Sequence, residues 1–361
     1  MNSLQQRQQV ADEKSCFWIT VKTLPVLFVV GVITCLTAIY GRFPLRHALT
    51  QETTFTYRLE MAWFFWCLLM LVISYSMALV TDPGRVPNTP AWSFGDATPA
   101  VQTGETKRTG ERRSCKWCER YKPDRCHHCR VCRTCVLRMD HHCPWINNCV
   151  GFHNHKYFML VLVYSAIACL LMVSRLLPFV QVAIDQDVPF VTMFALLFGL
   201  CMSCLFGVMV SCFLVFHIWL MCNAMTTIEY CETRRKHLAR HGHEAPLRYD
   251  QGIYHNVCAC LGTNPMLWAF PINTAPGDGL SYPLAASPHQ AAGSGATGVL
   301  DEWTRKGSSE SSPASRQSRR VSRALAGAGA SVVDSARAPI LLEARTGSRS
   351  SSDPDDRSSL A

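Results

Sequence analysis

The stretch that decides the fold runs from residue 115 to residue 158 and reads CKWCERYKPDRCHHCRVCRTCVLRMDHHCPWINNCVGFHNHKYF. It holds eight of the nineteen cysteines and six of the thirteen histidines of this 361-residue chain. Structural zinc takes four Cys or His ligands, usually supplied by Cys-x2-Cys pairs. Long apolar segments lie on both sides of the stretch. The sequence therefore predicts a metal-braced module held next to a membrane.

Four apolar segments approach or exceed the roughly 20 residues that cross a bilayer. They contain no Asp, Glu or Lys, and only Arg175 is charged; they are residues 23–40, 61–80, 157–177 and 192–221. Each segment alone could instead be a buried core helix. The first segment is the weakest candidate for a membrane span, because Lys22 and Pro25 stand at its start. We predict an integral membrane α-helical protein, with four transmembrane helices and a cytosolic Cys-rich domain between helices 2 and 3.

The net charge of +9 is unevenly distributed. Residues 81–156 carry thirteen Lys and Arg, whereas residues 179–191 carry none. The positive-inside tendency places the Cys-rich segment and both termini in the cytosol, although three arginines in residues 41–60 argue the other way. In a chain with four spans, this basic charge favours anionic lipid or an anionic cosubstrate over nucleic acid. The cytosol is reducing, so its Cys-x2-Cys pairs indicate metal or catalysis rather than disulfides.

The predicted organisation has seven segments, read from composition and breaker residues. They are a disordered cytosolic N-terminus (1–15), transmembrane helices 1 and 2 (16–80), an Asp-Pro-Gly turn and linker (81–111), the Cys-rich zinc domain (112–156), transmembrane helices 3 and 4 (157–221), a cytosolic region that begins near a Thr-Thr-Ile-Glu segment (222–272) and a disordered tail (273–361). The Cys-rich domain joins the third span directly, so any reactive group in it lies close to the bilayer surface.

The Cys-rich domain offers enough ligands for two closed zinc sites. The eight best placed by spacing are Cys115, Cys118, His128, Cys129, Cys132, Cys135, His142 and Cys149. Spacing alone does not exclude Cys126, His127, His153 or His155, and it does not say which ligands share an ion. Three overlapping Cys-x2-Cys pairs favour metal strongly over ordinary buried cysteines.

Two closed sites leave Asp140, His141 and Cys143 unused. Nucleophilic catalysis by cysteine needs a thiolate, a base within hydrogen-bond reach and a group that orients the base. In an extended segment, His141 and Cys143 share one face, while His142 points away towards zinc. Pro144 disfavours a helical conformation at Cys143. The three residues left over, Asp140, His141 and Cys143, therefore have the composition of a catalytic triad.

These motifs together resemble the DHHC protein S-acyltransferases, or palmitoyltransferases. The match is ungapped over the pattern Cys115-x2-Cys118-x3-Lys122-Pro123-x-Arg125-x2-His128-Cys129-x2-Cys132-x2-Cys135-x4-Asp140-His141-His142-Cys143-x5-Cys149-x4-Asn154-x3-Phe158. The resemblance extends to Asp82-Pro83-Gly84 after the second span and to Thr226-Thr227-Ile228-Glu229 after the fourth.

The resemblance implies that Cys143 is acylated by a fatty acyl-CoA such as palmitoyl-CoA and is then attacked by a substrate cysteine. It assigns His141 as the base, Asp140 as its orienter and Trp145 as a neighbour of the acyl chain. The implied partners are the membrane, acyl-CoA and cysteine-containing proteins, without nucleic acid. The implied location is the Golgi or the endoplasmic reticulum, with the plasma membrane as the alternative.

The resemblance also divides the metal ligands between two structural zinc ions. One ion would take Cys115, Cys118, His128 and Cys135, and the other Cys129, Cys132, His142 and Cys149. Supporting residues would be Thr226, Thr227, Glu229 and Asn256, and Arg138 and Lys156 are candidates for the CoA phosphates. The chain departs from the family pattern at Leu261, where an aromatic residue is expected after Asn256.

Two other interpretations use the same residues. A membrane-anchored zinc adaptor or RING-like ubiquitin ligase would need the metal ligands but not the remaining Cys143. A catalytically silent member of the DHHC family would bind acyl-CoA or a partner without transferring the acyl group. The presence of all three residues Asp140, His141 and Cys143 favours the enzyme.

Overall fold

The computed structural model describes residues 3–50, 54–94, 101–107, 109–238 and 249–284. Residues 285–361 lie outside this described part. The described residues include four helical segments that are long and apolar enough to cross a membrane, and these are Val21–Leu49, Phe55–Val80, His155–Asp185 and Phe190–Cys222. The Cys-rich region lies between the second and the third, so the predicted fold class is confirmed.

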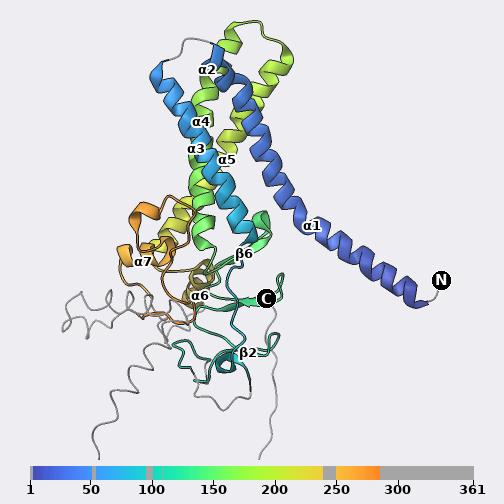
Figure 1. Cartoon of the computed structure of the whole chain (residues 1–361), viewed down its shortest axis with the longest axis vertical. Helices are drawn as coiled ribbons and strands as arrows, with labels where there is room; N and C mark the ends of the chain where they lie inside the picture. Colours follow the sequence, from blue (N-terminus) through green and yellow to red (C-terminus); the bar gives the residue numbers. More distant parts are fainter. Residues whose placement is uncertain (1–2, 51–53, 95–100, 108, 239–248, 285–361) are drawn as a thin grey trace, which may run out of the picture. The chain divides into compact units, whose positions relative to one another are not determined.

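The helices follow the apolar segments but extend beyond them (Figure 1). They are α1 (Ser3–Tyr40), the π-helical turn η1 (Gly41–Leu45), α2 (Arg46–Thr50), α3 (Phe55–Val80), α4 (His155–Asp185), α5 (Phe190–Cys222), α6 (Thr227–Leu238) and α7 (Ile253–Leu261). Short 3-10 turns occupy Pro90–Trp92 (η2), Pro144–Ile146 (η3) and Pro265–Leu267 (η4).

The expectation of a disordered N-terminus is not met in the structure, because α1 begins at Ser3. Gln, Glu, Ala, Arg and Lys dominate the segment before the first span, and all of them have high helix propensity. A helix that is already nucleated in an apolar span can continue through such residues, since propagation is far easier than nucleation. Polarity alone was therefore a poor reason to predict disorder there.

The core of the membrane-spanning part lies among α3, α4 and α5, and α4 packs against both α3 and α5 (Figure 1). Tyr40 at the end of α1 stacks on Phe64 of α3, with ring centroids 3.7 Å apart. Large apolar side chains on the outer face of α5, including Phe194, Leu205 and Val208, stay exposed. Such a face is stable against lipid and unfavourable in water, which agrees with a multi-pass membrane protein.

The Cys-rich region contains three short antiparallel hairpins rather than an extended sheet. Their strands are β1 (Ser114–Cys115) with β2 (Arg120–Tyr121), β3 (His127–Cys129) with β4 (Thr134–Val136), and β5 (His141–Cys143) with β6 (Asn148–Val150). Pairs this small are marginal by themselves. Their Cys and His side chains gather into clusters, so ligands rather than strand length stabilise the region.

The Asp-Pro-Gly turn after α3 attaches the Cys-rich region to the helices. The Pro83 carbonyl accepts a hydrogen bond from the His153 amide at 3.2 Å, and the Gly84 carbonyl accepts one from the Leu137 amide at 2.9 Å. At Gly151 an added Cβ would lie 2.6 Å from the Pro83 oxygen, so only glycine fits this close approach. The turn therefore fixes the β3–β4 hairpin and the β5–β6 hairpin relative to the end of α3.

The segment after α7 packs back on the molecule. Asn273 donates to the His153 carbonyl at 2.9 Å, Leu280 packs against the cluster that contains Trp92, and Tyr282 stacks beside Arg125. The predicted start of the disordered tail at residue 273 is therefore wrong, because aromatic and apolar residues as far as 282 find partners. The remainder of the predicted tail, residues 285–361, lies outside the described residues.

Candidate active site and metal clusters

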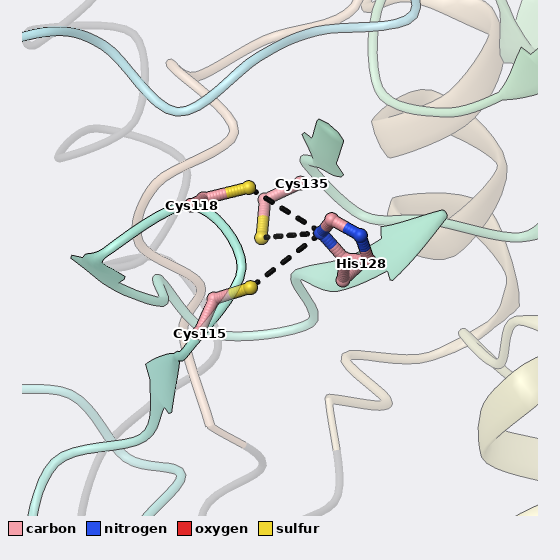
Figure 2. Close-up of side chains that lie close together, drawn as sticks. All are labelled: Cys115, Cys118, His128 and Cys135. Carbon is pink, nitrogen blue, oxygen red and sulfur yellow. Dashed lines mark hydrogen bonds between the residues drawn. The ribbon is translucent and has the colours of Figure 1, made fainter. Parts of the chain in front are cut away.

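The first Cys/His cluster joins two hairpins around His128 (Figure 2). The Nδ1 atom of His128 lies 3.5 Å from Cys115 Sγ, 3.3 Å from Cys118 Sγ and 3.8 Å from Cys135 Sγ. A tetrahedral zinc with ordinary bond lengths separates its nitrogen and sulfur ligands by about 3.5 Å. The donor set and its spacing therefore fit one structural zinc.

The second cluster repeats this arrangement around His142. Its Nδ1 atom lies 3.7 Å from Cys129 Sγ, 3.4 Å from Cys132 Sγ and 3.6 Å from Cys149 Sγ. The same separation of about 3.5 Å fits zinc here as well. Two Cys/His clusters that suit zinc are therefore present in the Cys-rich region, and their members are those that the family resemblance implied.

The electrostatics of the first cluster also suit a cation. Burial and the neighbouring Cys135 and Cys115 thiols raise the pKa of Cys118 to about 12. Thiols gathered this closely resist ionisation, whereas a divalent cation stabilises the thiolate form and removes that penalty. A bound divalent cation would therefore be needed to keep these thiols ionised at neutral pH.

Asp140 and His141 form the acid–base pair of the candidate site. The His141 Nδ1–H donates to Asp140 Oδ2 at 2.7 Å, which leaves the other ring nitrogen free to serve a thiol. Burial would raise the pKa of Asp140, but the hydrogen bond from His141 and nearby imidazoles lower it below its usual range. Burial likewise lowers the pKa of His141, yet the bonds to Asp140 and Cys143 raise it to about 9.

Cys143 is held on the same side of β5 as His141. The strand is extended over His141–Cys143, as predicted, so alternate side chains share a face. The Cys143 thiol is close enough to His141 to raise the pKa of its imidazole, while His142, between them, turns to the second Cys/His cluster. One strand thus presents a thiol with its base on one side and a metal ligand on the other.

A cavity of about 710 Å³ opens next to Cys143. His141, Cys143 and Trp145 line one part of it, and the rest is almost wholly apolar, with side chains from every membrane-spanning helix such as Val32, Leu36, Leu71, Leu162, Met172 and Phe213. Trp145 is about half exposed and lies 6.0 Å from Phe28 of α1, measured between ring centroids. The cavity suits a long apolar chain that ends at the thiol.

The Thr-Thr-Ile-Glu segment approaches Asp140 from the end of α5. The Thr227 amide donates to Asp140 Oδ1 at 2.9 Å, and its hydroxyl donates to the Asp140 carbonyl. Glu229 Oε2 in turn accepts from the Thr226 amide at 2.9 Å. These bonds hold the carboxylate of Asp140 in place for His141.

Glu229 is itself held by the buried Arg125, through two hydrogen bonds of 2.7 Å each. Arg125 lies between the rings of Tyr249 and Tyr282, at 4.5 and 5.2 Å from their centroids. Burial raises the pKa of Glu229, but Arg125, the Thr226 amide and Arg138 together lower it below its usual value, so the carboxylate stays charged. The sequence marked Arg125 only as part of a motif, and its basic character gave no sign of this buried partner.

Asn256 connects α7 to the end of α5. Its side-chain amide donates to the Cys222 carbonyl at 2.7 Å, and its oxygen accepts from the Gln251 amide at 3.0 Å. Leu261, where the family pattern has an aromatic residue, packs with Met159 and Met221. The departure at Leu261 thus keeps an apolar contact between α7 and the membrane helices.

Arg138 and Lys156 do not take the role suggested for them at the CoA phosphates. Both are nearly fully buried. Arg138 donates to the Ala259 carbonyl at 3.0 Å, and Lys156 donates to the carbonyls of Leu267 and Ile272 at 2.8 and 2.7 Å. Buried cations must be paired; Arg138 secures α7 itself and Lys156 secures the segment after it, rather than a phosphate.

Comparison with known proteins agrees with this site. A family model described as DHHC palmitoyltransferase matches residues 108–234. Palmitoyltransferase ZDHHC15A of Danio rerio is 42% identical over 178 residues, which cover 49% of this chain and 53% of that protein. Palmitoyltransferase ZDHHC15 of Homo sapiens is 38% identical over 178 residues, which cover 49% of this chain and 51% of that protein. The chain thus spans about half the length of these curated relatives.

A third relative is covered more fully. Probable protein S-acyltransferase 15 of Arabidopsis thaliana is 37% identical over 226 residues, which cover 59% of this chain and 84% of that protein. With this coverage and the matching family model, the chain belongs to the DHHC palmitoyltransferase family. The resemblance predicted from the sequence motifs is confirmed.

Proposed function

We propose that this protein is a protein S-acyltransferase that uses Cys143 as its nucleophile. It would transfer a fatty acyl group, such as palmitoyl, from acyl-CoA to cysteine thiols of membrane-associated proteins. One observation carries the proposal: Cys143 shares a strand face with His141 beside an apolar cavity among the membrane-spanning helices. A zinc adaptor would need neither the triad nor the cavity.

In the first step, Cys143 attacks the thioester carbonyl carbon of acyl-CoA. His141 takes the thiol proton, and Asp140 stabilises the imidazolium that results. The new bond joins Cys143 Sγ to the carbonyl carbon, and the bond from that carbon to the CoA sulfur breaks. The proton on His141 then passes to the departing CoA thiolate, so the products are acyl-Cys143 and CoA.

In the second step, the thiol of a substrate protein takes the place of CoA. His141 removes its proton, and the substrate sulfur attacks the acyl carbon while the bond to Cys143 Sγ breaks. The proton returns from His141 to Cys143. The acyl chain stays in the cavity throughout, which spares about 0.8 kcal/mol per methylene of exposure to water.

The two Cys/His clusters would hold structural zinc, with Cys115, Cys118, His128 and Cys135 on one ion and Cys129, Cys132, His142 and Cys149 on the other. Bound zinc supplies crosslinks between hairpins that are too short to be stable alone. The second cluster fixes β5 directly, because His142 lies between His141 and Cys143. Thr226, Thr227, Glu229 and Asn256 would keep Asp140 and the ends of α5 and α7 in place.

We further propose that the Cys-rich domain and both termini face the cytosol of an endomembrane compartment, the Golgi or the endoplasmic reticulum. The charge distribution supports this orientation, since thirteen Lys and Arg fall in residues 81–156. Fatty acyl-CoA would be the donor, and cysteine-containing proteins at the membrane would be the acceptors.

The decisive experiment is labelling of the detergent-purified full chain with labelled palmitoyl-CoA. The wild type should gain a hydroxylamine-sensitive label, and Cys143→Ser should not. Cys212 lines the same cavity, so Cys212→Ser is a matched control that should retain the label. Peptide mapping should place the label on Cys143, apart from Cys222 and Cys231 near the membrane. Equal labelling of wild type and Cys143→Ser would refute the proposal.

A further inference from the structure

A second histidine lies behind the candidate triad without a hydrogen-bond partner. His217 stands on α5, about one turn before that helix ends at Cys222, and only 1% of it is exposed. Neither of its ring nitrogens has a hydrogen-bond partner among the described residues. Buried polar atoms are almost always paired, with protein or with ordered water. The two ring nitrogens therefore call for a partner other than the described side chains, such as an ordered water.

The polar surroundings of His217 are two buried side chains. Asp140, His155 and His217 each present one ligand-type atom, and these three atoms lie within 4.8 Å of one another. All three residues are buried. Asp140 comes from the strand segment that carries the nucleophile, whereas His155 is the first residue of α4. Three elements thus converge on one small polar site.

The remaining surroundings of His217 are rings. Phe213 lies edge-on at 4.4 Å and Phe158 at 5.1 Å between centroids. The His141 ring lies 5.8 Å away, and Phe158 also packs edge-on against His141 at 5.2 Å. His217 is therefore part of the wall that confines the catalytic imidazole, as well as a neighbour of Asp140.

A single water molecule fits the geometry of this polar site. Hydrogen bonds span about 2.7–3.0 Å, so one water can reach two polar atoms that lie 4.8 Å apart. Three polar neighbours are what a buried water typically has. A histidine can donate from one nitrogen and accept at the other, so it can pair with a water whose own protons go elsewhere.

We propose that His217 is a positioning residue for acyl transfer. Through one buried water shared with His155, it would hydrogen-bond the Asp140 carboxylate, and its ring would hold His141 beside Cys143. The inference rests on the acyl-transfer function proposed above. It assigns His217 an effect on the rate of the chemical step rather than on acyl-CoA binding, because Phe158 and Phe213 line the acyl cavity whereas His217 behind them does not.

The test separates the ring of His217 from its nitrogens. His217→Phe keeps a flat ring and removes both nitrogens, whereas His217→Gln keeps a donor and an acceptor. In single-turnover labelling with palmitoyl-CoA, we expect the Phe variant to be ~10–100-fold slower, the cost of a misplaced catalytic group. The Gln variant should stay within about threefold of wild type. The half-saturating palmitoyl-CoA concentration should be the same in all three proteins.

Each contrary outcome overturns the inference. A Phe variant as fast as wild type, or a Gln variant slower than the Phe variant, would leave His217 with a packing role only. A third tightly bound zinc in the wild type would show that a cation, not water, occupies the site. Zinc content and thermal unfolding of each variant identify misfolding.

The same pair of substitutions at His155 provides an independent arm if the His217 variants misfold. We expect the same order of rates, and a double variant no slower than the slower single one, because both residues act through one water. Additive losses at the two positions would contradict this. A wild type that takes no label would instead refute the proposed function, so the two failures are distinguishable.

Discussion

Two hairpins of the Cys-rich region carry the same three residues in different surroundings. Strand β3 reads His127-His128-Cys129, and strand β5 reads His141-His142-Cys143. In each, the central histidine lies opposite a cysteine of its own zinc cluster, and the first histidine lies opposite a valine. Local sequence and register therefore do not distinguish the proposed nucleophile from a cysteine of a Cys/His cluster.

The difference between the two strands begins one residue earlier. Cys126 precedes β3 and Asp140 precedes β5. Burial, with the nearby charges of Arg113 and Lys122, lowers the pKa of His127 to about 4. The hydrogen bonds of His141, by contrast, outweigh burial and raise its pKa to about 9. The carboxylate of Asp140 thus lets the His141 imidazole hold a proton near neutral pH, whereas His127, which has no such neighbour, stays neutral.

The third residue completes the contrast. Cys129 turns into the second zinc cluster, whereas Cys143 faces the apolar cavity. Asn148, opposite Cys143, donates to the Thr81 carbonyl at 2.9 Å and so ties the β5 hairpin to the end of α3. The location of the hairpin is what places its cysteine on the wall of the apolar cavity.

The largest expected effect comes from removing the carboxylate that distinguishes β5. Asp140→Asn should slow palmitoyl-CoA labelling by at least ~10²-fold, within the range of general base catalysis, because His141 loses both its tautomer and its charge partner. The zinc content should stay at two per chain. A labelling rate within threefold of wild type would remove Asp140 from the mechanism.

The next prediction compares the two Cys/His clusters by removing the histidine of each and measuring zinc content and labelling. His142→Ala and His128→Ala should each lose one zinc, because each leaves three ligands of four. We expect labelling to fall ~10–100-fold further in His142→Ala than in His128→Ala, since only the second cluster fixes β5. Zinc analysis beside labelling of the folded fraction checks this. Equal labelling of the two variants would mean that the clusters are not specialised.

A smaller effect is expected at the ion pair that connects the two hairpins. Arg125 stands at the start of the β3 hairpin and reaches Asp140 through Glu229 and Thr227. Glu229→Gln leaves a buried guanidinium without its anion, which costs about 3–5 kcal/mol in comparable pairs. We expect lower thermal stability and slower labelling than in wild type.

The matched control for Glu229→Gln is Glu111→Gln. Glu111 pairs with Lys107 at 3.1 Å, and both side chains are largely exposed. Exposed pairs contribute little, so this variant should unfold and label as wild type does. If both glutamine variants were equally stable, the Arg125–Glu229 pair would have no special role.

The sequence predicted much of this site, because its chemistry lies in closely spaced residues. Ligand counting left Asp140, His141 and Cys143 as a remainder, and the extended conformation around Pro144 put the last two on one face. The sequence could not predict Arg125 with Glu229, or His217 beside Asp140, because these contacts join residues about a hundred or about eighty positions apart. Buried partners at such separations depend on how the helices pack, which no local pattern records.

The same limit applies to the fold. Apolar runs predicted the four spans, since lipid imposes a length and a composition on each. The ends of the ordered region were predicted poorly. Residues 3–15 are helical through propensity, and the segment as far as Tyr282 is held by partners such as Arg125. Composition measures how polar a segment is, but it does not show whether the segment has a buried partner elsewhere in the fold.

The smallest expected effect concerns His127, the first histidine of β3. It tests whether β3 and β5 share only their sequence and not a role in acyl transfer. His127 has no carboxylate directly before it, and its strand contributes to the two Cys/His clusters rather than to the cavity, so its protonation should play no part in acyl transfer. His127→Gln should label within about twofold of wild type, whereas His141→Gln should lose ~10²-fold or more as the base is removed. Two zincs in both variants would show that the folds are intact. A large loss at His127 would mean that the two His-His-Cys strands act together, and the contrast between a structural and a catalytic hairpin would fail.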